Sequence, residues 1–199
     1  MAAAAAGTPA DAGAPAVALV VRALAFATLR HTDQRRKGSR AQPYVNHLAE
    51  VALLVSEATA GADAALVAAA LLHDVVEDQE VTPAEIAATF GADVAGLVME
   101  VTDDKALDAA ERKRRQVAHA PHLSARAKVL KLADKTANLR SLAQDPPLDW
   151  GIGRMRAYVE WSRAVAAGLR GRAPALEAAF DAAADEAISA IDARMAAPT

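Results

Sequence analysis

Apolar residues recur every three or four positions along most of the chain, which is the spacing of one buried face of an α-helix. Glycine, proline and capping residues divide this pattern into segments, and no useful stretch alternates between apolar and polar residues as a β-strand would. The predicted helices begin at Val17, behind Pro43, behind Gly61, at Thr82, near Val94 and at Ser124, and two more cover residues 152–169 and 174–194. The pattern therefore predicts an all-α protein, a compact bundle of about eight or nine helices.

Two segments carry explicit signals for the start of a helix. Thr82 precedes Pro83, and Glu85 stands three residues after Thr82, so threonine is expected to cap a helix with proline in its first turn. Ser124 stands in the same way before a long segment that ends at Pro146-Pro147. Helices are therefore expected directly after Thr82 and Ser124.

Composition and charge are typical of a single globular domain. The 199 residues are 53% hydrophobic and only 4% aromatic, and the formal net charge is −3. Much of the apolar content is alanine, which favours helices, and a negative chain argues against nucleic acid as a partner. We expect residues 1–15, rich in Ala, Gly and Pro, to be disordered, and residues 16–199 to form one domain.

No segment indicates secretion or insertion into a membrane. The N-terminus has no basic region, and Arg22 interrupts the apolar stretch after Pro15. Cysteine is absent, which excludes a disulfide framework and a cysteine-based nucleophile or zinc site. A cytoplasmic location fits these features, and nothing in the sequence points to a protein partner or to an oligomeric state.

The strongest chemical signal is a group of polar residues inside the third apolar segment. The stretch Ala-Leu-Leu-His-Asp-Val-Val-Glu-Asp contains His73, Asp74, Glu77 and Asp78. His73 and Glu77 are one helical turn apart, as are Asp74 and Asp78, so the four are expected on adjoining strips of one continuous helix. Burying such groups is unfavourable unless they are paired or bind a metal ion. A divalent ion is therefore a candidate ligand.

His47 and Asp134 lie in two other apolar segments and complete a candidate metal site with His73 and Asp74. Two imidazoles and two carboxylates suit Mn²⁺, Fe²⁺, Co²⁺ or Zn²⁺ better than Ca²⁺. A His-Asp pair alone is a weak signal, and an aspartate flanked by lysines usually lies on a solvated face. The joint pattern favours a site at which a metal ion acidifies water for hydrolysis.

Other polar residues have simpler interpretations. We expect His31 to be structural or to support the site without binding a metal. His119 and His122 flank Pro121 and are expected to be exposed loop residues. The run Arg112-Lys113-Arg114-Arg115 is expected to be a solvated helix face or a rim that attracts phosphate.

The order His…His-Asp…Asp is similar to that of the HD superfamily, and the surrounding residues resemble the hydrolase domain of RelA/SpoT proteins. Within that family the chain most resembles the small alarmone hydrolases, the group of the metazoan SpoT homologue. The likeness runs from about residue 19 to the C-terminus through Arg36-Lys37, Pro43-Tyr44-Val45-Asn46-His47, residues 73–78, Val101-Thr102-Asp103-Asp104-Lys105, Lys131-Leu132-Ala133-Asp134-Lys135, Asn138-Leu139, Arg154, Tyr158, Glu160 and Trp161.

This resemblance implies a metal-dependent 3′-diphosphohydrolase that cleaves (p)ppGpp to GDP or GTP and pyrophosphate and so ends stringent-response signalling. It implies Mn²⁺ as the usual metal, held by His47, His73, Asp74 and Asp134. Glu77 and Asp78 would act on the water and the leaving group, although the sequence does not say which of the two is the proton donor. Substrate contacts would come from Arg36 and Lys37 at the base, Asn138 at the ribose, and Arg154 with Tyr158 toward the phosphates.

Two alternatives stay open at this point. The same fold and metal site would also suit (p)ppApp or another purine nucleotide such as NADPH, and residues 38–42, Gly-Ser-Arg-Ala-Gln, depart from the shorter turn common in the family. A catalytically silent module that binds a nucleotide and regulates a partner is the other alternative. Glu77 and Asp78 argue against it, because a silent module needs neither.

Overall fold

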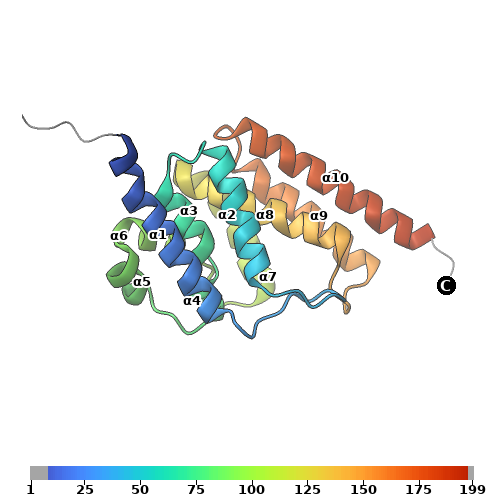
Figure 1. Cartoon of the computed structure of the whole chain (residues 1–199). Coiled ribbons are helices and arrows are strands. Elements are labelled where there is room, and N and C mark those ends of the chain that lie inside the picture. Colours follow the sequence, from blue (N-terminus) through green and yellow to red (C-terminus); the bar gives the residue numbers. More distant parts are fainter. Residues whose placement is uncertain (1–8, 197–199) are drawn as a thin grey trace, which may run out of the picture.

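The computed structural model describes residues 9–196, with side chains from residue 15 onward, and this part of the chain folds into helices (Figure 1). The α-helices are α1 (Pro9–Arg30), α2 (Val45–Ala58), α3 (Ala64–Leu72), α4 (Val75–Asp78), α5 (Pro83–Phe90), α6 (Ala92–Val101), α7 (Ala109–His119), α8 (Ala125–Gln144), α9 (Ile152–Ala167) and α10 (Pro174–Ala196). A short 3-10 helix, η1 (Ala120–His122), follows α7. Within residues 9–196 extended pairing is limited to one isolated bridge between Arg35 and Pro43, so the all-α prediction is confirmed.

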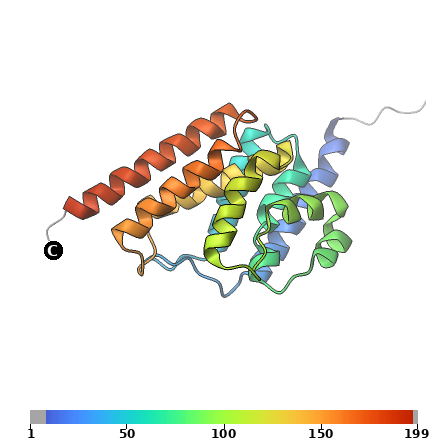
Figure 2. The same cartoon turned by 180° about the vertical axis from the view of Figure 1, so that it is seen from behind.

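Two helices form the centre of the bundle. Every residue of α3 from Leu66 to Leu72 is buried, and α8 buries most of its length. Helix α3 packs against α1, α2 and α6, whereas α8 packs against α10 and α2. Figures 1 and 2 show α1, α5 and α6 on one side of the molecule and α9 and α10 on the other. The elements that carry the candidate site, α2, α3 and α8, therefore meet in the interior.

The capping signals act as predicted. The Thr82 hydroxyl accepts a hydrogen bond from the Glu85 N–H at 3.2 Å, and α5 begins at Pro83. The Ser124 hydroxyl accepts from the Ala127 N–H at 3.2 Å at the start of α8. Each cap satisfies a backbone donor that the first helical turn leaves free.

Two expectations about helix boundaries were wrong. Helix α1 begins at Pro9 rather than at Val17, whereas residues 1–8 lie outside the described part of the chain. The third helix is not continuous, because α3 ends at Leu72 and α4 starts at Val75. Nδ1 of His73 lies 2.7 Å from the carbonyl oxygen of Ala70, the acceptor that the N–H of Asp74 would use in an unbroken helix. This break adds α4, and α7 was not among the helices predicted from the sequence, so the described residues form ten α-helices where eight or nine were expected.

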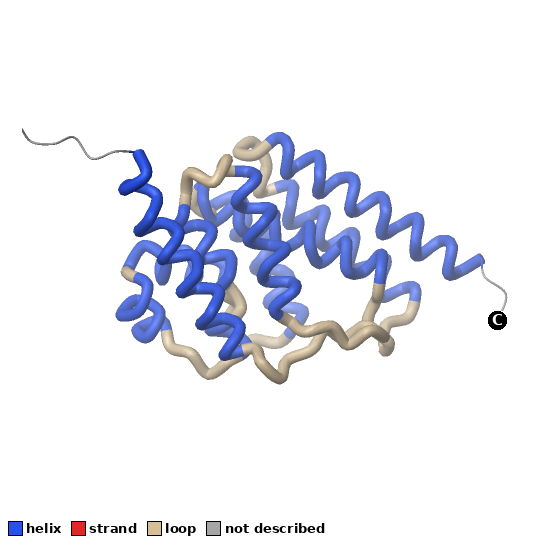
Figure 3. Tube along the Cα trace, in the orientation of Figure 1, coloured by secondary structure: helices blue, strands red, loops and turns tan. Residues whose placement is uncertain are grey.

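The loops that join the helices run mainly along one end of the bundle (Figure 3). The longest connects α1 to α2 through residues 31–44. It folds back on itself, with Arg36 N–H bonded to the Gln42 carbonyl at 2.9 Å and Tyr44 N–H to the Gln34 carbonyl at 3.0 Å. None of the described helices is both long and apolar enough to cross a bilayer.

Candidate active site

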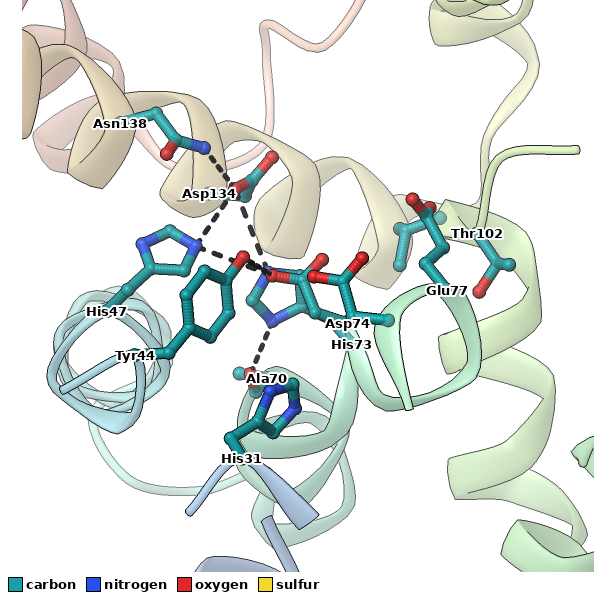
Figure 4. Close-up of polar contacts among 12 residues, drawn as sticks. His31, Tyr44, His47, Ala70, His73, Asp74, Glu77, Thr102, Asp134 and Asn138 are labelled. Carbon is teal, nitrogen blue, oxygen red and sulfur yellow. Dashed lines mark hydrogen bonds and ion pairs between the residues drawn. The ribbon is translucent and has the colours of Figure 1, made fainter. Parts of the chain in front are cut away.

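The four predicted metal ligands come together from two helices, α2 and α8, and from the break between α3 and α4 (Figure 4). Nε2 of His47 lies 3.4 Å from Asp134 Oδ1 and 3.8 Å from Asp74 Oδ2. Nε2 of His73 lies 3.1 Å from Asp74 Oδ2 and 3.7 Å from Asp134 Oδ1. Both imidazoles therefore face the same two carboxylate oxygens, and the four atoms surround a space large enough for one ion.

Local structure orients His73 toward this centre. Because its Nδ1 is bonded to the Ala70 carbonyl, that nitrogen carries a proton and Nε2 is the nitrogen that faces the centre. Burial would lower the pKa of His73, but the Asp74 and Asp134 carboxylates raise it in the protein alone, so a metal ion bound at Nε2 would displace a proton. A backbone carbonyl on the outer nitrogen is the usual support of a metal-binding histidine. The break after Leu72 thus turns the His-Asp pair inward.

The donor set fits a divalent metal ion. Ligand atoms of His47, His73 and Asp134 lie within 4.8 Å of one another, and all three residues are buried. Nε2 of His47 and Nε2 of His73 have no hydrogen-bond partner although both are buried. Two buried ring nitrogens without hydrogen-bond partners are unfavourable in the protein alone. An ion bound between them would satisfy both nitrogens.

The charges around this centre also suit a cation. Burial would raise the pKa of Asp134, but Lys135 and the two imidazoles hold it well below its usual range. The pKa of Asp74 is likewise lowered, because the nearby His73 outweighs burial. Burial lowers the pKa of His47, which keeps it neutral. Ionised carboxylates and a neutral imidazole are the forms that bind metals.

Tyr44 supports the centre and was not assigned a role from the sequence. Its hydroxyl donates to Asp74 Oδ2 at 2.6 Å. Its ring stacks on buried His31 with centroids 5.2 Å apart and meets the His47 ring edge-on at 5.6 Å. His31 therefore lies behind Tyr44 rather than at the centre. The motif around Tyr44 was visible in the sequence, but its contact with Asp74 depends on how two distant segments pack.

The His-Asp centre borders a cavity of about 140 Å³ whose lining includes His73, Asp74, Glu77 and Asp134, and we call this space the metal-type cavity. A larger cleft of about 380 Å³ lies next to it. Tyr44 and Asn138 line both spaces. The cleft is further lined by residues 34–38, Asp78, Ser141, Leu142, Asp145, Pro147, Trp150 and Tyr158. Four of the five predicted substrate contacts, namely Arg36, Lys37, Asn138 and Tyr158, therefore share one cleft.

Arg36 is linked to the centre by a chain of hydrogen bonds. Its guanidinium donates to Asn138 Oδ1 at 3.0 Å, and the Asn138 amide donates to Asp134 Oδ1 at 2.6 Å. The same guanidinium lies over the Tyr44 ring, 5.6 Å from its centroid. A flat cation is thus held at the wall shared by the cleft and the cavity, where it can also stack on a base.

Glu77 and Asp78 point into different spaces. Glu77 lines the metal-type cavity, and its Oε1 accepts from the Asp103 N–H at 2.6 Å. Burial, together with the charges of Asp74 and Asp103, raises the pKa of Glu77. Asp78 lines the cleft and accepts hydrogen bonds from Lys105 at 2.8 Å and Gln34 at 2.9 Å. Both residues belong to α4, and consecutive side chains on a helix point about 100° apart, so the two carboxylates have different surroundings.

Asp145 holds the loop that follows Lys37. Its carboxylate accepts from the Ser39 N–H at 2.8 Å, the Ser39 hydroxyl at 2.7 Å and the Arg40 N–H at 3.1 Å. Gly38 packs directly against the same carboxylate, with no room for a side chain. The departing sequence Gly-Ser-Arg-Ala-Gln is thus anchored beside the cleft, with Gly38 in its lining, a role that the sequence did not reveal.

Arg154 lies beside the cleft rather than in its lining. Its guanidinium packs on the Trp150 ring, 4.5 Å from the centroid, and pairs with Asp149 at 3.5 Å. Tyr158, one turn further along α9, is in the lining. His119 and His122 are exposed as expected, although both lie in helical segments rather than in a loop.

A helical domain in which an adjacent His-Asp pair meets a histidine and an aspartate from two other helices defines the class of HD-domain proteins. The family model described as HD domain matches residues 23–159. The curated guanosine-3′,5′-bis(diphosphate) 3′-pyrophosphohydrolase MESH1 of Xenopus tropicalis is 47% identical over 82% of this chain and 92% of its own length. The human MESH1 protein is 46% identical over 82% of this chain and 91% of its own length.

A solved structure of a metazoan SpoT ortholog that hydrolyses ppGpp is also similar. It superposes with a TM-score of 0.81 at 43% identity, covering 83% of this chain and 93% of that one. The chain belongs to the HD-domain family and, within it, to the group of the MESH1 proteins.

Proposed function

We propose that this protein is a metal-dependent hydrolase that removes the 3′-diphosphate of (p)ppGpp, giving GDP or GTP and pyrophosphate. The observation that carries the proposal is the pair of adjoining spaces, a metal-type cavity and a nucleotide-sized cleft, which share Tyr44 and Asn138 in their walls. A nucleotide in the cleft would place its 3′ side at the cavity. The activity in the names of the MESH1 relatives supports the same substrate.

His47, His73, Asp74 and Asp134 would hold the metal, for which we propose Mn²⁺, with Zn²⁺, Fe²⁺ or Co²⁺ as other candidates. When bound, the ion supplies a Lewis acid for the phosphate and lowers the pKa of water. We further propose that the enzyme is cytoplasmic and that its substrate is a small nucleotide.

The hydrolysis adds one water to the substrate. The bond between ribose O3′ and phosphorus breaks, the water oxygen joins the released pyrophosphate, and O3′ takes up a proton. Glu77 lines the cavity and its pKa is raised by burial, so its carboxylate is suited to accept the proton of the water. Asp78, which lines the cleft and is paired with Lys105, would hold the proton that reaches O3′.

The cleft residues would position the nucleotide. The Arg36 guanidinium would stack on the purine face, with Lys37 beside it, and Asn138 would contact the ribose. Tyr158, with Arg154 on the neighbouring turn, would lie toward the phosphates. Stacking does not read the exocyclic groups of a purine, so adenine nucleotides are the relevant competitors.

Product analysis tests the proposal. The full chain is incubated with Mn²⁺ and ppGpp, pppGpp, ppApp or NADPH in parallel, and nucleotides and phosphates are quantified. We expect GDP and pyrophosphate in equal amounts from ppGpp, with loss of turnover in excess chelator and in Asp74→Ala. Asp33→Ala, which changes an exposed aspartate outside both spaces, is the matched control.

Release of orthophosphate alone would refute the assignment. The same holds if ppGpp is inert while ppApp or NADPH is consumed. A protein that binds ppGpp tightly but turns over none of the four nucleotides would be the silent module.

A further inference from the structure

Three aromatic side chains form a row along α9 and the turn before it. The ring centroids of Trp150 and Tyr158 are 5.3 Å apart, and those of Tyr158 and Trp161 are also 5.3 Å apart. Trp161 Nε1 donates to the carbonyl oxygen of Lys113 at 3.1 Å, which ties α7 to this row. We call these three residues the aromatic row.

Three cations lie on the aromatic row. Nζ of Lys135 is 4.4 Å from the Trp161 centroid, and Nζ of Lys113 is 5.1 Å from the same centroid. The Arg154 guanidinium lies over Trp150. They come from α8, α7 and α9, so residues far apart in the sequence bring three positive charges to one wall.

The three cations are not balanced by an equal number of carboxylates. Lys135 pairs with Asp134 and Arg154 with exposed Asp149, but no salt bridge involves Lys113 among the described residues. Partial burial, and then the charges of Arg154 and Lys135, lower the pKa of Lys113. Like charges held together destabilise one another, and an anion bound between them would relieve the repulsion.

The wall connects the two spaces of the proposed active site. Lys135 lines the metal-type cavity, where its Nζ lies 3.3 Å from Asp134 Oδ2. At the other end, Trp150 and Tyr158 line the cleft. Lys113 and Arg154 lie on the rings of the aromatic row rather than in the lining of either space. The three cations thus extend from the cavity along this row, and such a set matches a linear chain of phosphates better than a single phosphate.

We propose that Lys113, Lys135 and Arg154 form a diphosphate subsite on the aromatic row, with Lys113 as a specificity-determining contact. The subsite rests on the proposed function for its natural ligand, a nucleotide that carries diphosphates. Two diphosphates of that ligand share the required chemistry. One is the 5′-diphosphate that stays on the nucleoside, and the other is the pyrophosphate that leaves.

Binding to the metal-stripped full chain tests the subsite without turnover. GDP, inorganic pyrophosphate and guanosine are titrated by calorimetry at low salt into the unmodified protein, Lys113→Met, Lys113→Arg and Arg114→Met. Methionine keeps the apolar stem of lysine and removes its charge. Arg114, next to Lys113 on α7 and also exposed but paired with Glu111, provides the matched control.

We expect Lys113→Met to weaken at least one diphosphate about tenfold or more, the size typical of a lost hydrogen bond to a charged group. Lys113→Arg and Arg114→Met should bind as the unmodified protein does, and guanosine should be unaffected throughout. A loss for GDP alone assigns the subsite to the 5′ arm, and a loss for pyrophosphate alone assigns it to the leaving group. A loss for both means that either diphosphate can occupy it.

The proposal is overturned if Lys113→Met and the unmodified protein bind both diphosphates equally well, or if the unmodified protein binds neither. Failure of the proposed function has a different signature. A chain that does not hydrolyse ppGpp but loses diphosphate affinity in Lys113→Met has the subsite and another substrate.

Discussion

The hydroxyl group of Tyr44 donates a 2.6 Å hydrogen bond to Oδ2 of Asp74, the oxygen that also faces the imidazoles of His47 and His73. Tyr44 lines both the cleft and the metal-type cavity. Together with Asn138, which donates to Asp134, it connects the wall of the cleft to the proposed metal ligands. The two parts of the Tyr44 side chain have different roles: the ring packs under Arg36, whereas the hydroxyl holds Asp74.

Tyr44→Phe should therefore weaken metal binding and leave nucleotide binding nearly unchanged. Loss of a hydrogen bond that orients a metal ligand typically costs 10–100-fold in affinity or activity. We expect a loss of about that size in Mn²⁺ affinity, measured by titration of the stripped protein, with KM for ppGpp within about twofold at saturating metal. Tyr44→Ala, which also removes the ring beneath Arg36, should raise KM as well. Unchanged Mn²⁺ affinity in Tyr44→Phe would contradict this role.

Glu77→Gln should lower kcat by about 10²-fold or more, the usual consequence of losing an acid–base group. Its metal content should be retained, because Glu77 is bonded to the Asp103 N–H and is not part of the His-Asp cluster. Single-turnover kinetics and metal analysis of the same preparation provide the check. Loss of the metal along with activity would make Glu77 a ligand instead.

Arg36→Ala should act mainly on KM. Stacking on the base is equally strong in the ground state and the transition state, so its removal weakens binding without slowing the chemical step. We expect KM for ppGpp to rise about tenfold with kcat nearly constant, as estimated for a cation over an aromatic face. Arg40→Ala, in the same loop but outside the lining of the cleft, is the control. An equal fall of kcat in Arg36→Ala would instead indicate that the link through Asn138 to Asp134 matters for catalysis.

A pH-dependent contribution to stability is expected where α3 begins. Asp63 caps α3 by accepting from the Leu66 N–H at 3.0 Å, and both of its oxygens accept from Arg126 at 2.7 Å. Burial would raise the pKa of Asp63, but the hydrogen bonds from Arg126 and Leu66 lower it overall. A carboxylate whose folded pKa is lowered stabilises the fold above its ordinary value of 3.8 and loses that contribution as the pH falls through the folded pKa.

Asp63→Ala should lower the free energy of unfolding by about 1–2 kcal/mol at pH 7, the range for loss of a helix cap. Asp63→Asn should lose less, because asparagine can still cap the helix. In denaturant titrations, the difference between the unmodified protein and Asp63→Asn should shrink below about pH 4. Asp93→Asn, at the exposed end of the same arginine, should have almost no effect at any pH. A gap for Asp63→Asn that persists unchanged in acid would refute the charge-based account.

The sequence by itself determined the helical class, several boundaries and the identities of the groups at the centre. Thr82 and Ser124 signal helix starts because a cap acts on backbone groups only three residues away, and such local chemistry is readable without a fold. The order of His47, His73-Asp74 and Asp134 was likewise visible, because ionisable residues are conspicuous against apolar helical segments.

Only the tertiary structure decided which space each of those groups lines and which residues it contacts. The break after Leu72 depends on the bond between His73 and Ala70, and periodicity predicted an unbroken helix there. Glu77 lines the cavity and Asp78 the cleft although they are adjacent in sequence, because the elements packed around α4 determine which space each side chain meets. The contacts of Tyr44 with Asp74, of Asp145 with the loop after Lys37, and of Lys113 with Trp161 join residues 30 or more positions apart. Such contacts arise from the packing of whole helices, which the spacing of residues along one segment does not encode.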